Sequence, residues 1–171
     1  MKTTPIETGA AAVPKSPSDA VAVTWASCFG AGYFPVASGT FGTLVALPFA
    51  YLLTLLPSKA LWALVVAVYV AITVWAAHRA GKHYGVADAR QIVADEWAGF
   101  FVAVAFLPWN WKVAVAGFFV FRFFDVFKPW PANFFDRRLK NGFGVTFDDV
   151  AAGLWTRAVM EVLARLGYLG V

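Results

Sequence analysis

Residues 60–78 have the sequence ALWALVVAVYVAITVWAAH and carry no charged side chain. A helix that spans a bilayer needs about 20 consecutive apolar residues. This stretch therefore predicts a membrane-spanning helix, the clearest one in the chain. It makes a bundle of membrane helices the expected fold.

The whole chain shares this apolar character. Of its 171 residues, 60% are hydrophobic and 14% are charged, and the mean hydropathy is +0.66. An average soluble domain is roughly 45–50% apolar and about 25% charged. The composition therefore excludes a disordered chain, a basic nucleic-acid-binding module and an ordinary soluble enzyme. The single cysteine, Cys28, excludes a disulfide framework and a cysteine-rich metal site.

We predict an all-α, polytopic protein with about four to five membrane helices, which form one domain over residues 19–171. Residues 1–18 are rich in Pro, Thr and Ser and are predicted to be a disordered tail. Glycines and Pro35 interrupt the uncharged stretch that follows, so we expect an irregular glycine-rich loop over residues 30–40. The expected helices cover residues 20–29, 41–56, 60–78, 92–107, 112–127 and 148–166, with polar loops over 79–91 and 128–147.

The basic residues are distributed unequally between the two predicted sides of the bundle. Alternation of the helices places the tail and both polar loops on one side, and the turns at 57–59 and 108–111 on the other. The positive-inside rule therefore predicts that the tail and both loops face the cytoplasm. The first side carries Lys2, Lys15, Arg79, Lys82, Arg90, Lys128, Arg137, Arg138 and Lys140, and the second carries Lys59 and Lys112.

Six of the ten acidic residues are expected at or near the cytoplasmic helix ends or in the loop between them. A charged side chain in the middle of a membrane helix costs about 2.5–3.5 kcal/mol on insertion scales. Because each such acid is costly, the clustering of these six acids at one depth indicates that they share a function. These residues are Asp95, Glu96, Asp125, Asp136, Asp148 and Asp149.

Structural roles are the alternative for these acids. The acidic pairs at 95–96 and 148–149 are expected in the first turns of their helices, where the helix dipole stabilises an anion. Thr146 and Asp149 also resemble a capping box.

Asp125 differs from the acidic pairs because it is expected in the last turn of a helix, where the dipole opposes an anion. Arg122 and Lys128 lie three residues before and after it on the same face. A local ion pair is therefore its alternative role.

Clustered carboxylates with few histidines are typical of a site for a hard cation such as Mg²⁺, which prefers carboxylate, water and phosphate oxygens. The basic residues Arg122, Lys128, Arg137 and Arg138 lie close by in the sequence and suit a phosphate. The combination predicts chemistry on a phosphorylated lipid head group. For Arg137, Arg138 and Lys140, simple attraction to anionic lipid is the alternative.

Four segments, in order, resemble the bacterial phosphatidylglycerophosphatase A family. They are FGAGYFPVASGTFGTLVALPF (29–49), IVADEWAGF (92–100), FRFFDVFKPWP (121–131) and GFGVTFDDVAAG (142–153). The resemblance runs over about residues 25–155. It implies a Mg²⁺-dependent, multi-pass phosphatase of the bacterial inner membrane whose active site faces the cytoplasm. Such an enzyme converts phosphatidylglycerol phosphate to phosphatidylglycerol and inorganic phosphate.

The resemblance also implies roles for individual residues. Water attack directed by Glu96 or Asp125 and an aspartyl-phosphate intermediate both stay open as mechanisms. The expected partners are the lipid substrate and membrane lipids, with no nucleic acid. The implied catalytic residues are Asp95, Glu96, Asp125, Asp148 and Asp149, and the Mg²⁺ ligands are Asp95, Glu96, Asp148 and Asp149. The expected substrate-binding residues are Ser38, Thr40, Arg122 and Lys128 from these segments, and Arg137 from the basic residues near the acids.

Two other functional classes are alternatives to this prediction. A membrane CDP-alcohol phosphotransferase would also use acids and Mg²⁺, but its DG-x2-AR stretch is not found in the sequence. A small cation carrier would place charges near mid-membrane and reach them from both sides, whereas the acids here gather at one face.

Overall fold

The computed structural model describes residue 14 and residues 16–171 of the chain. Within these residues the protein is built from seven α-helices and one short 3-10 helix, η1, with no strand. The predicted all-α class is therefore confirmed for the described residues. The helices are α1 (Pro17–Ala26), η1 (Ala31–Tyr33), α2 (Ser38–Thr54), α3 (Lys59–Tyr84), α4 (Ala94–Ala103), α5 (Trp111–Phe127), α6 (Ala132–Arg138) and α7 (Gly142–Arg165).

Polar side chains fix the points at which three of the four longest helices begin. The Ser58 hydroxyl accepts a hydrogen bond from the backbone N–H of Leu61 at the start of α3 (3.1 Å). Asn110 and Asn141 cap α5 and α7 in the same way, each accepting two backbone N–H groups. These caps satisfy donors that a helix start leaves unpaired.

Helix α3 is longer than predicted and contains part of the expected polar loop. It continues past residue 78 to Tyr84, so Arg79 and Lys82 are helical. It ends where Gly85 adopts a left-handed conformation (φ 76°), which glycine tolerates without a steric cost. The expected loop over 79–91 therefore shrinks to the residues between α3 and α4.

The expected loop over 128–147 also contains helical structure. Helix α6 lies within it, and α7 begins at Gly142, six residues earlier than predicted. Asp148 and Asp149 therefore lie beyond the first turn of their helix, which corrects the first-turn prediction. The capping-box prediction is wrong as well, because Asn141 is the cap and the Thr146 hydroxyl instead donates to the Gly142 carbonyl (2.8 Å).

The beginning of the chain differs from prediction in two places. The predicted disordered tail falls mostly outside the described residues, but Pro17 and Ser18 within it form the first turn of α1. The glycine-rich loop ends earlier than expected, since Ser38, Gly39 and Thr40 start α2.

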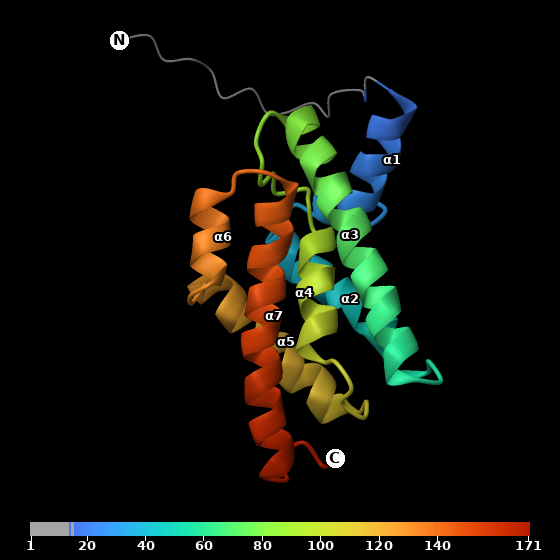
Figure 1. The fold of residues 1–171 in the computed structure, drawn as a ribbon, viewed down its shortest axis with the longest axis vertical. Coiled ribbons are helices and arrows are strands. Elements are labelled where there is room, and N and C mark those ends of the chain that lie inside the picture. The colour runs from blue at the N-terminus through green and yellow to red at the C-terminus, as the bar shows by residue number, and fades with distance from the viewer. Residues whose placement is uncertain (1–13, 15) are drawn as a thin grey trace.

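The helices form an elongated bundle in which α4 occupies the centre (Figure 1). Helices α3 and α7 run along most of its length, and α4 packs against both. Eight of the ten residues of α4 are buried. The turns that follow α2 and α4 lie at the same end as the C-terminus, whereas the loops that precede α4 and α7 lie toward the other end (Figure 1). This is the grouping of loops that the alternation of helices predicted.

One helix in the described part of the chain, α3, is both long and apolar enough to cross a membrane. Helix α2 is apolar but shorter, at 17 residues. The polytopic arrangement with four to five spanning helices thus stays a prediction.

Candidate functional site

The first turn of α4 carries Asp95 and Glu96 and is held from two sides. The backbone N–H of Val93, the residue before the helix, donates to the Ala26 carbonyl at the end of α1 (2.8 Å). The Tyr69 hydroxyl of α3 donates to the Ala94 carbonyl (3.2 Å). These bonds fix the position of the helix start and therefore of both acids.

Asp149 reaches the same place from α7 because α4 and α7 approach very closely. A β-carbon on Gly99 of α4 would overlap the backbone carbonyl of Asp149, and one on Gly153 of α7 would overlap the carbonyl of Gly99. Small residues at facing positions let helix backbones come into contact. The two glycines therefore place Asp149 beside the start of α4.

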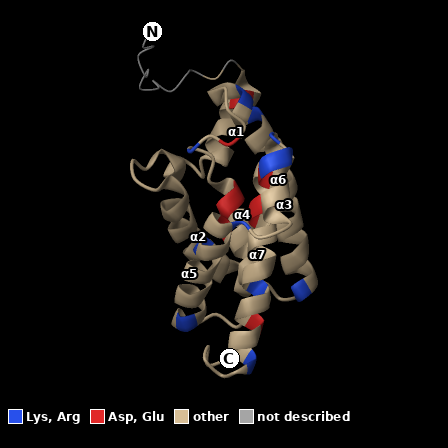
Figure 2. Cartoon of the chain, turned by 90° about the vertical axis from the view of Figure 1, so that its left-hand side faces the viewer, with Lys and Arg blue, Asp and Glu red and all other residues tan. Residues whose placement is uncertain are grey.

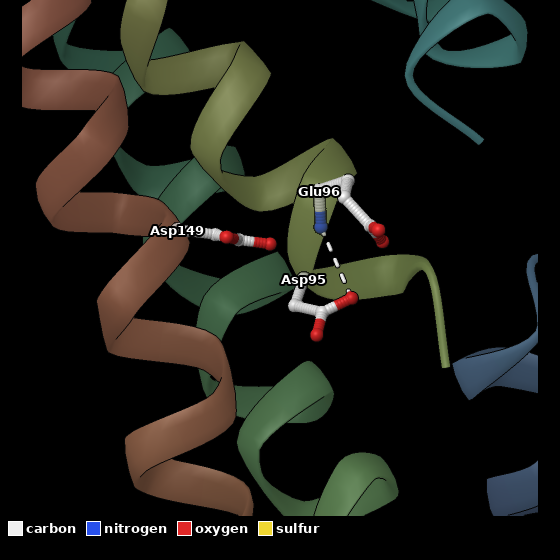
Figure 3. A group of neighbouring side chains, drawn as sticks. All are labelled: Asp95, Glu96 and Asp149. Carbon is white, nitrogen blue, oxygen red and sulfur yellow. Dashed lines mark hydrogen bonds between the residues drawn. The ribbon is translucent and has the colours of Figure 1, made fainter. Parts of the chain in front are cut away.

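Asp95, Glu96 and Asp149 form a compact acidic trio (Figure 3). One carboxylate oxygen from each lies within 4.8 Å of the others, and Asp95 and Asp149 are each only 4% exposed. The Glu96 Oε2 atom is buried and has no hydrogen-bond partner among the described residues. Two buried carboxylates and one half-buried carboxylate this close together repel one another unless a cation or protons compensate their charge.

Helix α5 supplies a basic side to this site. Arg122 Nη1 pairs with Asp125 Oδ2 at 2.7 Å, and Lys128 Nζ lies 3.8 Å from Asp125 Oδ1. Both pairs have the three-residue spacing seen in the sequence. Asp125, which is 8% exposed, is thus held between two cations.

Lys128 connects α5 to α7. Its ammonium group donates to Asp148 Oδ2 and lies 3.9 Å from Asp149 Oδ1. Burial lowers the pKa of the Lys128 amine. The surrounding carboxylates raise that pKa by more, and Asp149 and Asp148 contribute most to the rise. Lys128 is therefore held as a cation between the α5 and α7 acids.

Asp148 is separate from the acidic trio. Its Oδ2 accepts from Lys128, and its Oδ1 accepts the backbone N–H of Asp149 (2.8 Å). Both carboxylate oxygens are therefore occupied by protein donors. Of the four predicted metal ligands, the structure brings three together and pairs the fourth with Lys128.

The start of α2 closes the site on a further side. A β-carbon on Gly39 would overlap the Glu96 carboxylate and lie 3.4 Å from Arg122 Nη2. Arg122 Nη1 also donates to the Thr43 hydroxyl at 3.4 Å. The glycine-rich motif thus faces the acids and Arg122, as a substrate-contacting segment would.

The predicted substrate-binding residues of α2 lie in its first turn. The Ser38 hydroxyl donates to the Arg90 carbonyl (2.6 Å), which ties α2 to the loop before α4. Thr40 is exposed.

Arg137 lies on α6 and is exposed, and the ion pairs of the site in the described residues do not include it. Its neighbour Asp136 pairs with Lys140 at 3.6 Å and is also outside the trio. The alternative role of surface attraction to anionic lipid therefore suits Arg137 better than direct contact at the acids.

Three residues that shape the site were not singled out from the sequence. Gly99 and Gly153 allow the close helix contact, and Tyr69 holds the start of α4. The available signal was the glycine that follows each acidic pair, three residues after the pair in ADEWAG and four residues after it in DDVAAG.

Comparison with known proteins identifies the family. Residues 24–164 match the family described as phosphatidylglycerophosphatase A. The chain is 40% identical over 144 residues to phosphatidylglycerophosphatase A of Escherichia coli strain K12, covering 84% of this chain and 83% of the relative. The chain belongs to the phosphatidylglycerophosphatase A family. The family resemblance read from the four motifs is thereby confirmed.

Two further relatives support and broaden this assignment. Phosphatidylglycerophosphatase A of Haemophilus influenzae is 35% identical over 137 residues, covering 80% of this chain and 83% of the relative. A putative phosphatidylinositol-3-phosphatase of Bacteroides thetaiotaomicron is 35% identical over 142 residues, covering 78% and 87%. No solved structure matches the chain. As a member of the phosphatidylglycerophosphatase A family, the chain is a phosphoric monoester hydrolase.

Proposed function

We propose that this protein hydrolyses phosphatidylglycerol phosphate to phosphatidylglycerol and inorganic phosphate in a Mg²⁺-dependent reaction. The observation that carries the proposal is the compact, largely buried trio of Asp95, Glu96 and Asp149, which lies beside Arg122 of α5 and Lys128 at its end. Carboxylates suit a hard cation, and the adjacent guanidinium and ammonium groups suit a phosphate.

The residues of the trio fit a divalent cation. Their oxygens converge within 4.8 Å, and the unpartnered Glu96 Oε2 is an available acceptor. We assign Asp95, Glu96 and Asp149 as its ligands, and Asp148 as the residue that positions Lys128. When bound, Mg²⁺ would supply Lewis-acid stabilisation of the phosphate charge.

The other side chains of the site would neutralise charge and transfer protons. Arg122 and Lys128 neutralise negative charge on the phosphoryl group. Glu96 is favoured over Asp125 as the group that accepts the water proton, because Arg122 already occupies Asp125 at 2.7 Å. The water oxygen bonds to phosphorus as the bond to the glycerol oxygen breaks, and that oxygen leaves as a hydroxyl after taking a proton from solvent.

We also propose that the chain is a multi-pass protein of the bacterial inner membrane with this site facing the cytoplasm. Only 28% of the apolar window of α3 is buried, whereas the core helix of a soluble protein is mostly buried. Exposed large apolar side chains continue on the other long helices, for example Leu52, Phe119 and Val162. So much exposed apolar surface is expected where lipid surrounds the protein.

Phosphate release from purified protein tests the substrate assignment. The protein in detergent would be given phosphatidylglycerol phosphate and, separately, phosphatidylinositol 3-phosphate, the substrate class in one relative's name. We expect faster release from phosphatidylglycerol phosphate. Faster release from the inositol lipid would transfer the assignment to that head group, and release from neither by folded protein would overturn it.

A further inference from the structure

An apolar groove runs along the bundle between α3, α4 and α7, with a volume of about 830 Å³. Its wall on α3 extends from Trp62 to Val74, and α7 contributes Phe147 and Leu154. Twelve residues of helix rise roughly 18 Å. The groove is therefore longer than half of a hydrocarbon core about 30 Å thick.

A basic cavity of about 490 Å³ lies at the end of the molecule that holds the C-terminus. Its charged side chains are those of Lys59, Arg157, Arg165 and Glu161, and Val171, which carries the terminal carboxylate, also lines it. Three cations thus face two carboxylates. Arg157 and Arg165 both bond to Glu161 at 2.8 Å, so one carboxylate is shared by two guanidinium groups. Figure 2 shows basic segments gathered at this lower end of α3 and α7. The cavity thus keeps an excess of positive charge.

The groove and the basic cavity meet. Phe106 and Arg157 line both of them. Arg157 is fixed at this junction because its Nε donates to the Ala105 carbonyl (2.7 Å). Lys59 lies over the Phe106 ring, 5.8 Å from its centroid. Together they form a long apolar slot that ends in a cationic pocket.

We propose that this joint cavity binds an anionic membrane phospholipid, with an acyl chain in the groove and the phosphate in the basic cavity. Arg and Lys side chains form strong charge-assisted hydrogen bonds with phosphate oxygens. The basic end of this joint cavity is separate from the candidate active site, since Asp149 and Arg165 are roughly 24 Å apart along α7. The inference rests on the proposed membrane embedding and not on the phosphatase reaction.

Photo-crosslinking tests this lipid site. The full chain is reconstituted in phosphatidylcholine vesicles with a trace of lipid that carries a diazirine on one acyl chain. The probe has either a glycerol head group, which makes it an anionic phosphodiester, or a choline head group. Labelled peptides are mapped by mass spectrometry.

We expect the anionic probe to label residues 62–74 and 147–154 several-fold more than the choline probe. The double variant Lys59→Gln/Arg165→Gln should reduce that labelling to the level of the choline probe. Lys112→Gln is the matched control, because Lys112 is exposed and basic but does not line either cavity. Ala67→Trp, on the exposed wall of the groove, should reduce labelling by both probes.

Equal labelling by both head groups, or labelling that survives the double variant, would overturn the proposal. The absence of lipid adducts on these peptides in folded, active protein would also overturn it. Phosphatase activity and melting temperature are measured in parallel. None of the altered residues belongs to the candidate active site, so a loss of labelling with intact activity is specific to the lipid site.

Discussion

The carbonyl oxygen of Gly99 in α4 occupies the space that a β-carbon on Gly153 of α7 would need. This contact lets the two backbones approach closely enough for Asp149 to face Asp95. Gly153→Ala should therefore separate the helices and lower phosphatase activity, with a loss of about 1–3 kcal/mol in stability from overpacking. Melting temperature and phosphate release measure both effects.

Gly117→Ala is the matched control for this substitution. A β-carbon at Gly117 would meet only side-chain atoms, the nearest being Val104 Cγ1 at 3.0 Å. Both variants gain about 1 kcal/mol of helix propensity. A Gly153→Ala protein as active and stable as Gly117→Ala would contradict the proposed role of the close contact.

Asp149→Asn removes one charge from the acidic trio while keeping the side-chain size. We expect phosphatase activity to fall about 10²-fold or more, by analogy with removal of a single electrostatic stabiliser. Asp136→Asn is the control, because Asp136 forms a surface pair with Lys140, and such pairs contribute about 0–1 kcal/mol. Near-normal turnover in Asp149→Asn, with Asp136→Asn unchanged, would show that Asp149 is not required for the reaction.

Magnesium dependence can be measured both by turnover and by thermal stability. EDTA should abolish phosphate release, and added Mg²⁺ should restore it. Mg²⁺ should also raise the melting temperature, because a ligand that binds only the folded state stabilises it, by about 2.7 kcal/mol at 100 times its Kd. The Asp149→Asn variant should lack this rise. Full activity in excess chelator would exclude the metal.

Lys128→Gln leaves the buried Asp148 carboxylate without its cationic partner. An unpaired buried acceptor costs about 1–3 kcal/mol, and more when it is charged. We therefore expect lower stability together with loss of activity, whereas Lys128→Arg keeps the charge and should retain part of both. If Lys128→Gln equals wild type in melting temperature, the Lys128–Asp148 pair does not stabilise the fold.

The proposed topology predicts opposite labelling of two introduced cysteines in a Cys28→Ala background. Val86→Cys lies in the loop before α4, and Pro57→Cys lies in the turn before α3, at the other end of the bundle. A membrane-impermeant thiol reagent applied to intact cells should label only the cysteine at position 57. Labelling of position 86 instead would reverse the orientation.

The sequence by itself determined the helical class, the central apolar helix and the residue types of the site. Composition and the uncharged stretch at 60–78 required helices, because an apolar segment of that length must satisfy its backbone internally. The three-residue spacing of Arg122 and Asp125 fixed their common face, since neighbours on a helix surface follow from its period.

Only the tertiary structure decided which acids meet. Asp148 and Asp149 are adjacent in the sequence, yet one pairs with Lys128 of α5 and the other joins the α4 acids. Successive residues on a helix point about 100° apart, so their partners depend on which helices pack on each side. That packing rests on the contact between Gly99 and Gly153, and helix periodicity within one segment does not encode the distance between two segments.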